Sequence, residues 1–215
     1  MNTEVLIVEL SRNLQPVPLH GPRALLRRGL IRGAAVAMVL VLFWPSLAVR
    51  SDLSVAAVTM GFWMKLLYTA SIASLGFFAL ERLSRPGARD LHWTRLLWPP
   101  IALLALVTSI QLAIAPDGNT ASFWMGSSWF QCPLYVMLLS VPVFVGLVRA
   151  MAHLAPTRLE AAGAAAGLVA GATGASIYAL HCAETSPGFV LLWYSLGLAA
   201  ATLVGAAVGP RLLRW

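Results

Sequence analysis

The sequence predicts an all-α protein, a polytopic membrane bundle of six transmembrane helices. Of its 215 residues, 59% are apolar and only 11% are charged, and the mean hydropathy is +0.79. About a quarter of the residues in a soluble domain are charged. The apolar residues form continuous windows, unlike the alternating pattern of a transmembrane barrel. Because each helical span needs roughly 20 residues, the chain has no room for a soluble catalytic domain.

Residues 1–22 are predicted to be a cytoplasmic tail ahead of the bundle at 23–215. Thr3 is placed to cap a short helix, and prolines at 16, 18 and 22 prevent that helix from continuing. About three helical turns cannot fold alone. We therefore expect the tail to dock in a groove of a partner protein, to lie on the bilayer surface, or to pack on its own bundle. The apolar side chains of this helix are Val5, Leu6, Val8, Leu10 and Leu14.

Six continuous apolar windows predict the membrane spans. They fall at about 31–49, 60–80, 96–115, 132–148, 159–181 and 189–209. The connections are short, so successive helices are expected to be antiparallel neighbours. The first window, preceded by arginines and followed by Ser46-Leu47-Ala48, imitates a cleaved secretory signal. The roughly thirty residues before it are long for such a signal, and we favour a retained span.

The basic residues predict the orientation of the bundle. With the N-terminus inside, all of the fifteen lysines and arginines except Arg50 and Lys65 lie on the cytoplasmic side. Membrane proteins carry such an excess in their cytoplasmic loops. Both termini are therefore predicted to be cytoplasmic. The same distribution accounts for the net charge of +7, so we expect no direct contact with nucleic acid.

The fifth window is rich in small residues. Glycines recur at Gly163, Gly167, Gly171 and Gly174 among alanines. Small residues every fourth position allow helix backbones to approach closely. We expect this helix to pack tightly on another and to transmit a shift along its length.

Cys132 begins the fourth window and Cys182 ends the fifth, so the predicted orientation places both at the outer face. Two thiols at the same end of neighbouring helices are candidates for a disulfide bridge. With His181 and Glu184 they also offer a ligand set for a soft or borderline metal ion. Three interpretations stay open: a disulfide or redox pair, a metal site, and two unrelated small buried residues.

Few polar groups are predicted inside the membrane. Only Lys65 lies within a span, near its outer end, where we expect its ammonium group to snorkel to the interface. The sequence has no Walker loop, no paired carboxylates and no histidine-rich helix. It therefore predicts neither an enzyme nor a resident cofactor, apart from a transient heavy-metal ion at the cysteines.

Several stretches spread over nearly the whole chain resemble the NrsF-type anti-sigma factors. The most specific is Tyr178-Ala179-Leu180-His181-Cys182-Ala183-Glu184. The others are Thr3, Leu6, Ile7 and Leu10 followed by Pro16-Val17, the loop from Trp129 to Cys132, Leu139-Ser140-Val141-Pro142, Ala155-Pro156, and Trp193-Tyr194 with Arg211 and Trp215.

The resemblance implies a six-helix protein of the bacterial inner membrane that holds an extracytoplasmic-function sigma factor of the sigma-F kind. Cys132 and Cys182 match the paired outer cysteines that this family associates with metal or oxidative stress. The expected partner-binding residues are Thr3, Leu6, Ile7, Leu10, Leu14, Pro16 and Val17.

Three other functions compete with this interpretation. A small transporter would need a continuous polar path through the bundle, which the sequence does not show. A membrane thiol oxidoreductase would use the same cysteines together with a cofactor such as a quinone. The chain would otherwise be a purely structural subunit.

Overall fold

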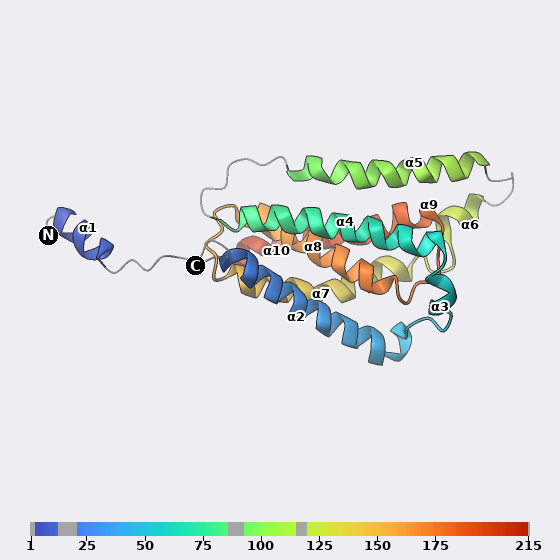
Figure 1. The fold of residues 1–215 in the computed structure, drawn as a ribbon, viewed down its shortest axis with the longest axis horizontal. Coiled ribbons are helices and arrows are strands. Elements are labelled where there is room, and N and C mark those ends of the chain that lie inside the picture. Colours follow the sequence, from blue (N-terminus) through green and yellow to red (C-terminus); the bar gives the residue numbers. More distant parts are fainter. Residues whose placement is uncertain (1–2, 13–20, 86–92, 115–119, 215) are drawn as a thin grey trace.

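The structure is a computed structural model that describes residues 3–12, 21–85, 93–114 and 120–214. Every regular element within these ranges is helical (Figure 1). The longer helices are α1 (Thr3–Ser11), α2 (Gly21–Phe43), α4 (Met60–Leu83), α5 (Trp98–Ile114), α7 (Gln131–Met151), α8 (Leu159–Tyr178) and α10 (Ser195–Leu212). The shorter elements are α3 (Leu53–Ala56), α6 (Thr120–Met125), α9 (Pro187–Phe189), the 3₁₀ turns Pro45–Leu47 and Trp93–Leu97, and a π-helical turn, Val190–Tyr194.

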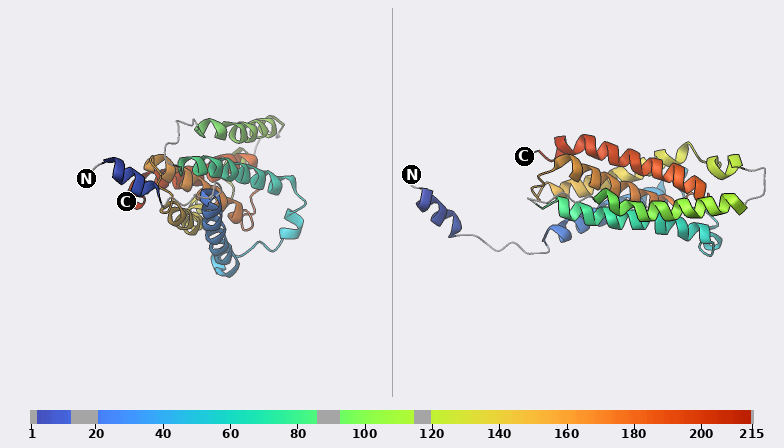
Figure 2. Two further views of the ribbon diagram at one scale, coloured as in Figure 1. Left: turned by 60° about the vertical axis from the view of Figure 1, so that its left-hand side comes forward. Right: turned by 90° about the horizontal axis from the view of Figure 1, so that it is seen from above.

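The two ends of the bundle differ in composition. At one end, which we call the basic end, α2 begins and α4, α7 and α10 finish (Figure 1). Arginines gather there, for example Arg28 on α2 and Arg149 on α7. We call the opposite end the cysteine end. There α4 and α7 begin, and the short helices α3, α6 and α9 lie in the connections between the long helices (Figures 1 and 2).

Helix α8 lies at the centre of the bundle because its small residues let neighbouring backbones touch it. A Cβ atom added to Gly163 would meet the backbone of Gly205 on α10, and one added to Gly167 would meet the backbone of Ala201. Most of α8 is buried. The glycine pattern predicted this close approach, and the structure identifies α10 as the partner helix.

Helices α2 and α7 form a second close pair. A Cβ atom on Gly29 would meet the backbone of Gly146, and one on Gly33 would meet the backbone of Pro142 and Val143. Dispersion contacts between such closely packed backbones stabilise helix pairs in a membrane, where the hydrophobic effect between helices is absent. A groove runs between these two helices.

Helix α5 lies at the periphery of the bundle (Figures 1 and 2). Only Leu104 and Thr108 on it are buried. Its remaining surface is apolar, and it exposes Leu103, Leu106, Ile110 and Ile114. Such a surface is suited to hydrocarbon rather than to water.

Five helical segments are long and apolar enough to cross a membrane: Met60–Leu83, Trp93–Ile114, Gln131–Met151, Leu159–Tyr178 and Pro187–Leu212. They coincide with the second to sixth predicted windows. The first predicted span, 31–49, falls on α2, which is not among the five. This helix begins at Gly21 and ends at Phe43, and Arg23, Arg27, Arg28 and Arg32 in its first half make it less apolar than the five segments.

The tail helix α1 stands apart from the bundle (Figure 1). Its apolar side chains Val5, Leu6, Ile7 and Val8 are exposed, Ile7 to 56%. The described part of the chain does not bury these side chains. The described part of the tail therefore does not pack on its own bundle in this structure. Docking on a partner protein and lying on the bilayer surface stay predictions.

Candidate functional site

The two cysteines lie together at the cysteine end. Cys132 is in the first turn of α7, and Cys182 follows the end of α8. Both side chains are buried, belong to the same hydrophobic core and are free thiols. They interact electrostatically with each other and with Lys65. The structure thus brings the two predicted sensing residues into one site, which we call the thiol site.

Close packing of α7 and α8 positions the thiol site. A Cβ atom on Gly174 would lie 3.1 Å from the carbonyl oxygen of Val136 and 3.0 Å from the backbone nitrogen of Ser140. Val136 is one helical turn after Cys132, so the two backbones meet immediately beneath the thiols. The backbone N–H of Cys182 donates to the carbonyl oxygen of Tyr178 at 3.0 Å, which ties the cysteine to the end of α8.

Two basic side chains hold the chain at Cys182. Lys65 Nζ donates to the carbonyl oxygens of Cys182 at 2.9 Å and Glu184 at 2.5 Å. Arg50 Nη1 donates to the same Cys182 oxygen at 3.4 Å. Lys65 is fully buried. The prediction that this lysine snorkels to the interface was wrong, because the carbonyls that follow α8 give its ammonium group partners inside the protein.

Arg50 is itself fixed by a carboxylate. Its Nε and Nη2 atoms donate to Oδ1 and Oδ2 of Asp52, both at 2.6 Å, in a two-pronged arrangement that suits a guanidinium group. The hydrogen bonds from Arg50 hold the pKa of the Asp52 carboxyl below its ordinary value. The backbone N–H of Arg50 also donates to Leu180 at 3.1 Å. Arg50, in the loop that follows α2, therefore holds the segment after α8 in place through hydrogen bonds to Leu180 and Cys182.

The predicted metal ligands His181 and Glu184 have other partners in this structure. His181 Nδ1 is 2.8 Å from the carbonyl oxygen of Ala48. Glu184 Oε1 accepts hydrogen bonds from the backbone N–H and the hydroxyl of Ser127, both at 2.7 Å. Gly126, with a φ of +57°, allows this turn to pass close to the Glu184 carboxylate. Within the described ranges no three such side chains form a group that could hold a metal ion, so the four predicted ligands are not assembled.

Three tyrosines pack against one another in the part of the core that holds the two cysteines. The rings of Tyr135 and Tyr178 lie 5.9 Å apart, and Tyr178 and Tyr194 are separated by the same distance. Tyr194 belongs to the π-helical turn, a distortion that often accompanies functional sites. Its buried hydroxyl has no hydrogen-bond partner of normal geometry among the described residues, and it interacts with Cys182. These tyrosines were not among the predicted site residues, although Tyr178 and Tyr194 fall within the motifs of the resemblance.

Lys65→Met is expected to loosen the chain at Cys182. The variant leaves the buried carbonyls of Cys182 and Glu184 without this donor, at a cost of about 1–3 kcal/mol in the free energy of unfolding. We expect a lower melting temperature in detergent and faster labelling of the thiols by maleimide. The control, Arg82→Met, removes an exposed cation from the other end of α4. Equal labelling rates in the two variants would contradict a holding role for Lys65.

The predicted partner-binding residues are only partly described. Thr3, Leu6 and Ile7 lie on α1 with exposed side chains, and Leu10 belongs to the same helix. Leu14, Pro16 and Val17 lie outside the described residues. The structure therefore shows a short helix with exposed apolar groups, and it does not bring Thr3, Leu6 or Ile7 near the thiol site.

Comparison with known proteins identifies relatives along the whole chain. The probable anti-sigma-F factor NrsF of Azospira oryzae is 38% identical over 215 residues, which cover 100% of both chains. The anti-sigma-F factor NrsF of Caulobacter vibrioides is 36% identical over 214 residues, or 99% of this chain and 97% of the relative. No solved structure matches. Residues 10–215 match the family model described as NrsF, negative regulator of sigma F, and the chain therefore belongs to this family.

Proposed function

We propose that the protein is a membrane-bound anti-sigma factor that sequesters an extracytoplasmic-function sigma factor at the bacterial inner membrane. The observation that carries this proposal is the full-length similarity to two proteins named anti-sigma-F factors. The family is one of regulators, as expected from a sequence without catalytic motifs. Family membership also favours this function over the transporter and the thiol oxidoreductase that the sequence left open.

The proposal includes six spans, with α2 as the first. The second half of α2, after Arg32, is apolar, and Val36 and Val39 on it are exposed. Its glycine-mediated contact with α7 keeps it alongside a helix that is long and apolar enough to span. Arginines at its start would lie at the cytoplasmic surface. Both termini would then be cytoplasmic, and the thiol site would face the periplasm.

The tail helix α1 is the proposed holding segment for the sigma factor. It is the part of the described chain whose apolar side chains stand away from the bundle, at the end where the arginines gather (Figure 1). A short apolar helix of this kind gains stability by docking in a groove of its partner. Arginines at the same end would steer an acidic partner surface toward it.

The thiol site is the proposed sensor. Oxidation would join Cys132 and Cys182 as a disulfide, with two protons and two electrons passing to the external oxidant. Alternatively, a soft metal ion would bind the two sulfur atoms. Both thiols are buried beneath the chain that Lys65 and Arg50 hold, so either reaction requires the cysteine end to rearrange. The rearrangement would shift α7 and α8 and weaken sigma-factor binding at the basic end. A tenfold release requires a difference of about 1.4 kcal/mol between the two states.

Co-purification of the detergent-solubilised protein with its sigma factor tests the proposal. We expect the sigma factor to accompany the full-length chain, and Leu6→Asp to reduce the recovered amount at least about tenfold, as for a truncated interface hot spot. The matched control is Ser11→Asp, which adds the same charge to the same helix at a polar position. Absence of a sigma factor from the wild-type preparation would contradict the proposed function. Equal recovery with the two variants would contradict the role of the tail.

A further inference from the structure

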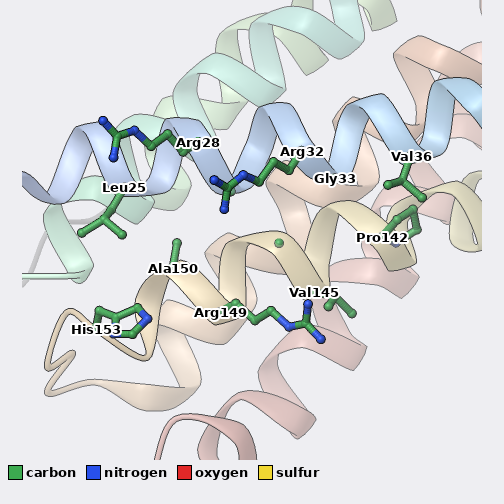
Figure 3. Close-up of a pocket in the computed structure, with 12 residues that line it drawn as sticks. Leu25, Arg28, Arg32, Gly33, Val36, Pro142, Val145, Arg149, Ala150 and His153 are labelled. Atoms are coloured by element: carbon green, nitrogen blue, oxygen red, sulfur yellow. The ribbon is translucent and has the colours of Figure 1, made fainter.

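A groove of about 610 Å³ runs between α2 and α7 near the basic end (Figure 3). Its walls come from these two helices, and Gly29, Gly33 and Gly146 form the line along which the backbones touch. Figure 3 shows Arg28 and Arg32 projecting from α2 and Arg149 from α7, with His153 at the end of α7. The volume lies within the range of small-molecule binding sites.

The arginines of this groove have no carboxylate partner in the described part of the chain. No aspartate or glutamate lines the groove, and the ion pairs among the described residues do not include Arg28, Arg32 or Arg149. Arg23 and Arg85, at the same end, both pair with Glu81. Three arginines that line one groove without a carboxylate favour an anionic ligand, and arginine binds phosphate in two-pronged geometry.

The other end of the groove is apolar. Val36 lies one turn beyond Arg32 on α2, and Val145 lies one turn before Arg149 on α7, so both helices change from basic to apolar in the same direction, away from the basic end. Both valines are exposed, and Pro142 lies between them (Figure 3). Four residues of an α-helix rise about 6 Å. A matching ligand therefore has a negative group at one end and hydrocarbon at the other.

We propose that this groove binds an anionic phospholipid, with the phosphate between Arg32 and Arg149 and an acyl chain along Val36 and Val145. Basic pockets between helices on the cytoplasmic side of a membrane commonly bind such headgroups. An acidic peptide would satisfy the charges but would leave the exposed valines uncovered. The inference rests on the membrane insertion proposed above and not on the sigma-factor role. It assigns to these arginines a specific ligand in addition to their effect on orientation.

Lipid retention by the full-length protein tests the proposal. The protein is incorporated into nanodiscs of phosphatidylcholine with one-fifth phosphatidylglycerol, re-extracted in uncharged detergent and analysed for bound lipid. We expect enrichment of phosphatidylglycerol, and the double variant Arg32→Gln and Arg149→Gln should reduce the enrichment at least about tenfold. The control, Arg23→Gln with Arg85→Gln, removes the same charge from the same end and should leave the enrichment within about twofold.

Two further measurements distinguish a bound lipid from other ligands. Val145→Trp should lower retention by filling the apolar end, whereas Val141→Trp, an exposed position outside the groove, should not. Millimolar inorganic phosphate should fail to displace the lipid. The proposal would be overturned if the double variant at Arg32 and Arg149 retained as much phosphatidylglycerol as the double variant at Arg23 and Arg85. Full displacement of the lipid by inorganic phosphate would also overturn it. Loss of sigma-factor binding with unchanged lipid retention would assign the groove to a peptide and also overturn it. A protein that enters no nanodisc, even one of phosphatidylcholine alone, would overturn membrane insertion instead.

Discussion

Gly167→Leu is expected to destabilise the bundle more than any other single substitution considered for this chain. A Cβ atom at this position would meet the carbonyl group of Ala201 and would lie 3.1 Å from the Cα atom of Thr202. These are backbone atoms of α10, which cannot rotate away as a side chain does. Overpacking in a closely packed core costs about 1–3 kcal/mol and occasionally more. Because accommodation here requires α8 and α10 to separate, we expect the upper end, about 3 kcal/mol.

Thermal unfolding in detergent, followed by circular dichroism, measures this effect. Gly21→Leu is the matched control, because nothing lies within 4 Å of a Cβ atom at the first residue of α2. Its effect should stay within about 0.5 kcal/mol, as for a typical surface substitution. The destabilisation by Gly171→Ala should lie between those of Gly167→Leu and Gly21→Leu, since its Cβ atom would meet the Ala201 side chain at 2.9 Å. Similar melting temperatures for Gly167→Leu and Gly21→Leu would contradict the close packing of α8 on α10.

The helices themselves were largely predictable from the sequence. The predicted windows at 60–80 and 132–148 correspond to α4 (Met60–Leu83) and α7 (Gln131–Met151), because apolar runs of membrane length leave few alternatives to a helix. The first window was less accurate. Apolarity marks the portion suited to lipid, whereas α2 begins earlier, since arginine is a good helix former, and ends before Pro45.

The details of the thiol site were less predictable. The topology of the windows was enough to place Cys132 and Cys182 at one end. The inward direction of the Lys65 side chain could not be predicted from these windows, because it depends on carbonyl groups 117 and 119 residues further along the chain. The partners of His181 and Glu184 are likewise distant, at Ala48 and Ser127. Hydrogen bonds between residues so far apart leave no local pattern in a single sequence.

Replacing both cysteines by serine is expected to abolish induction of the sigma-factor regulon while leaving repression in unstressed cells intact. Each single variant, Cys132→Ser or Cys182→Ser, should match the double variant, because neither a disulfide nor a two-sulfur metal site forms from one thiol. The pair would thus act as a unit, with strongly non-additive effects. A reporter gene under sigma-factor control, measured with and without an oxidant or a soft metal ion, provides the readout.

Alanine variants separate sensing from packing at these buried positions. Serine places a hydroxyl at a buried position, whereas Cys132→Ala and Cys182→Ala add no polar group. If the thiols act as a sensor, alanine and serine should abolish induction equally while the sigma factor still co-purifies. Since the chain has only two cysteines, oxidation of the purified wild-type protein should consume both thiols and lower its mass by about two hydrogens, as disulfide formation requires. Normal induction in the double alanine variant would show that the signal enters elsewhere, because no other thiol in the chain could receive it.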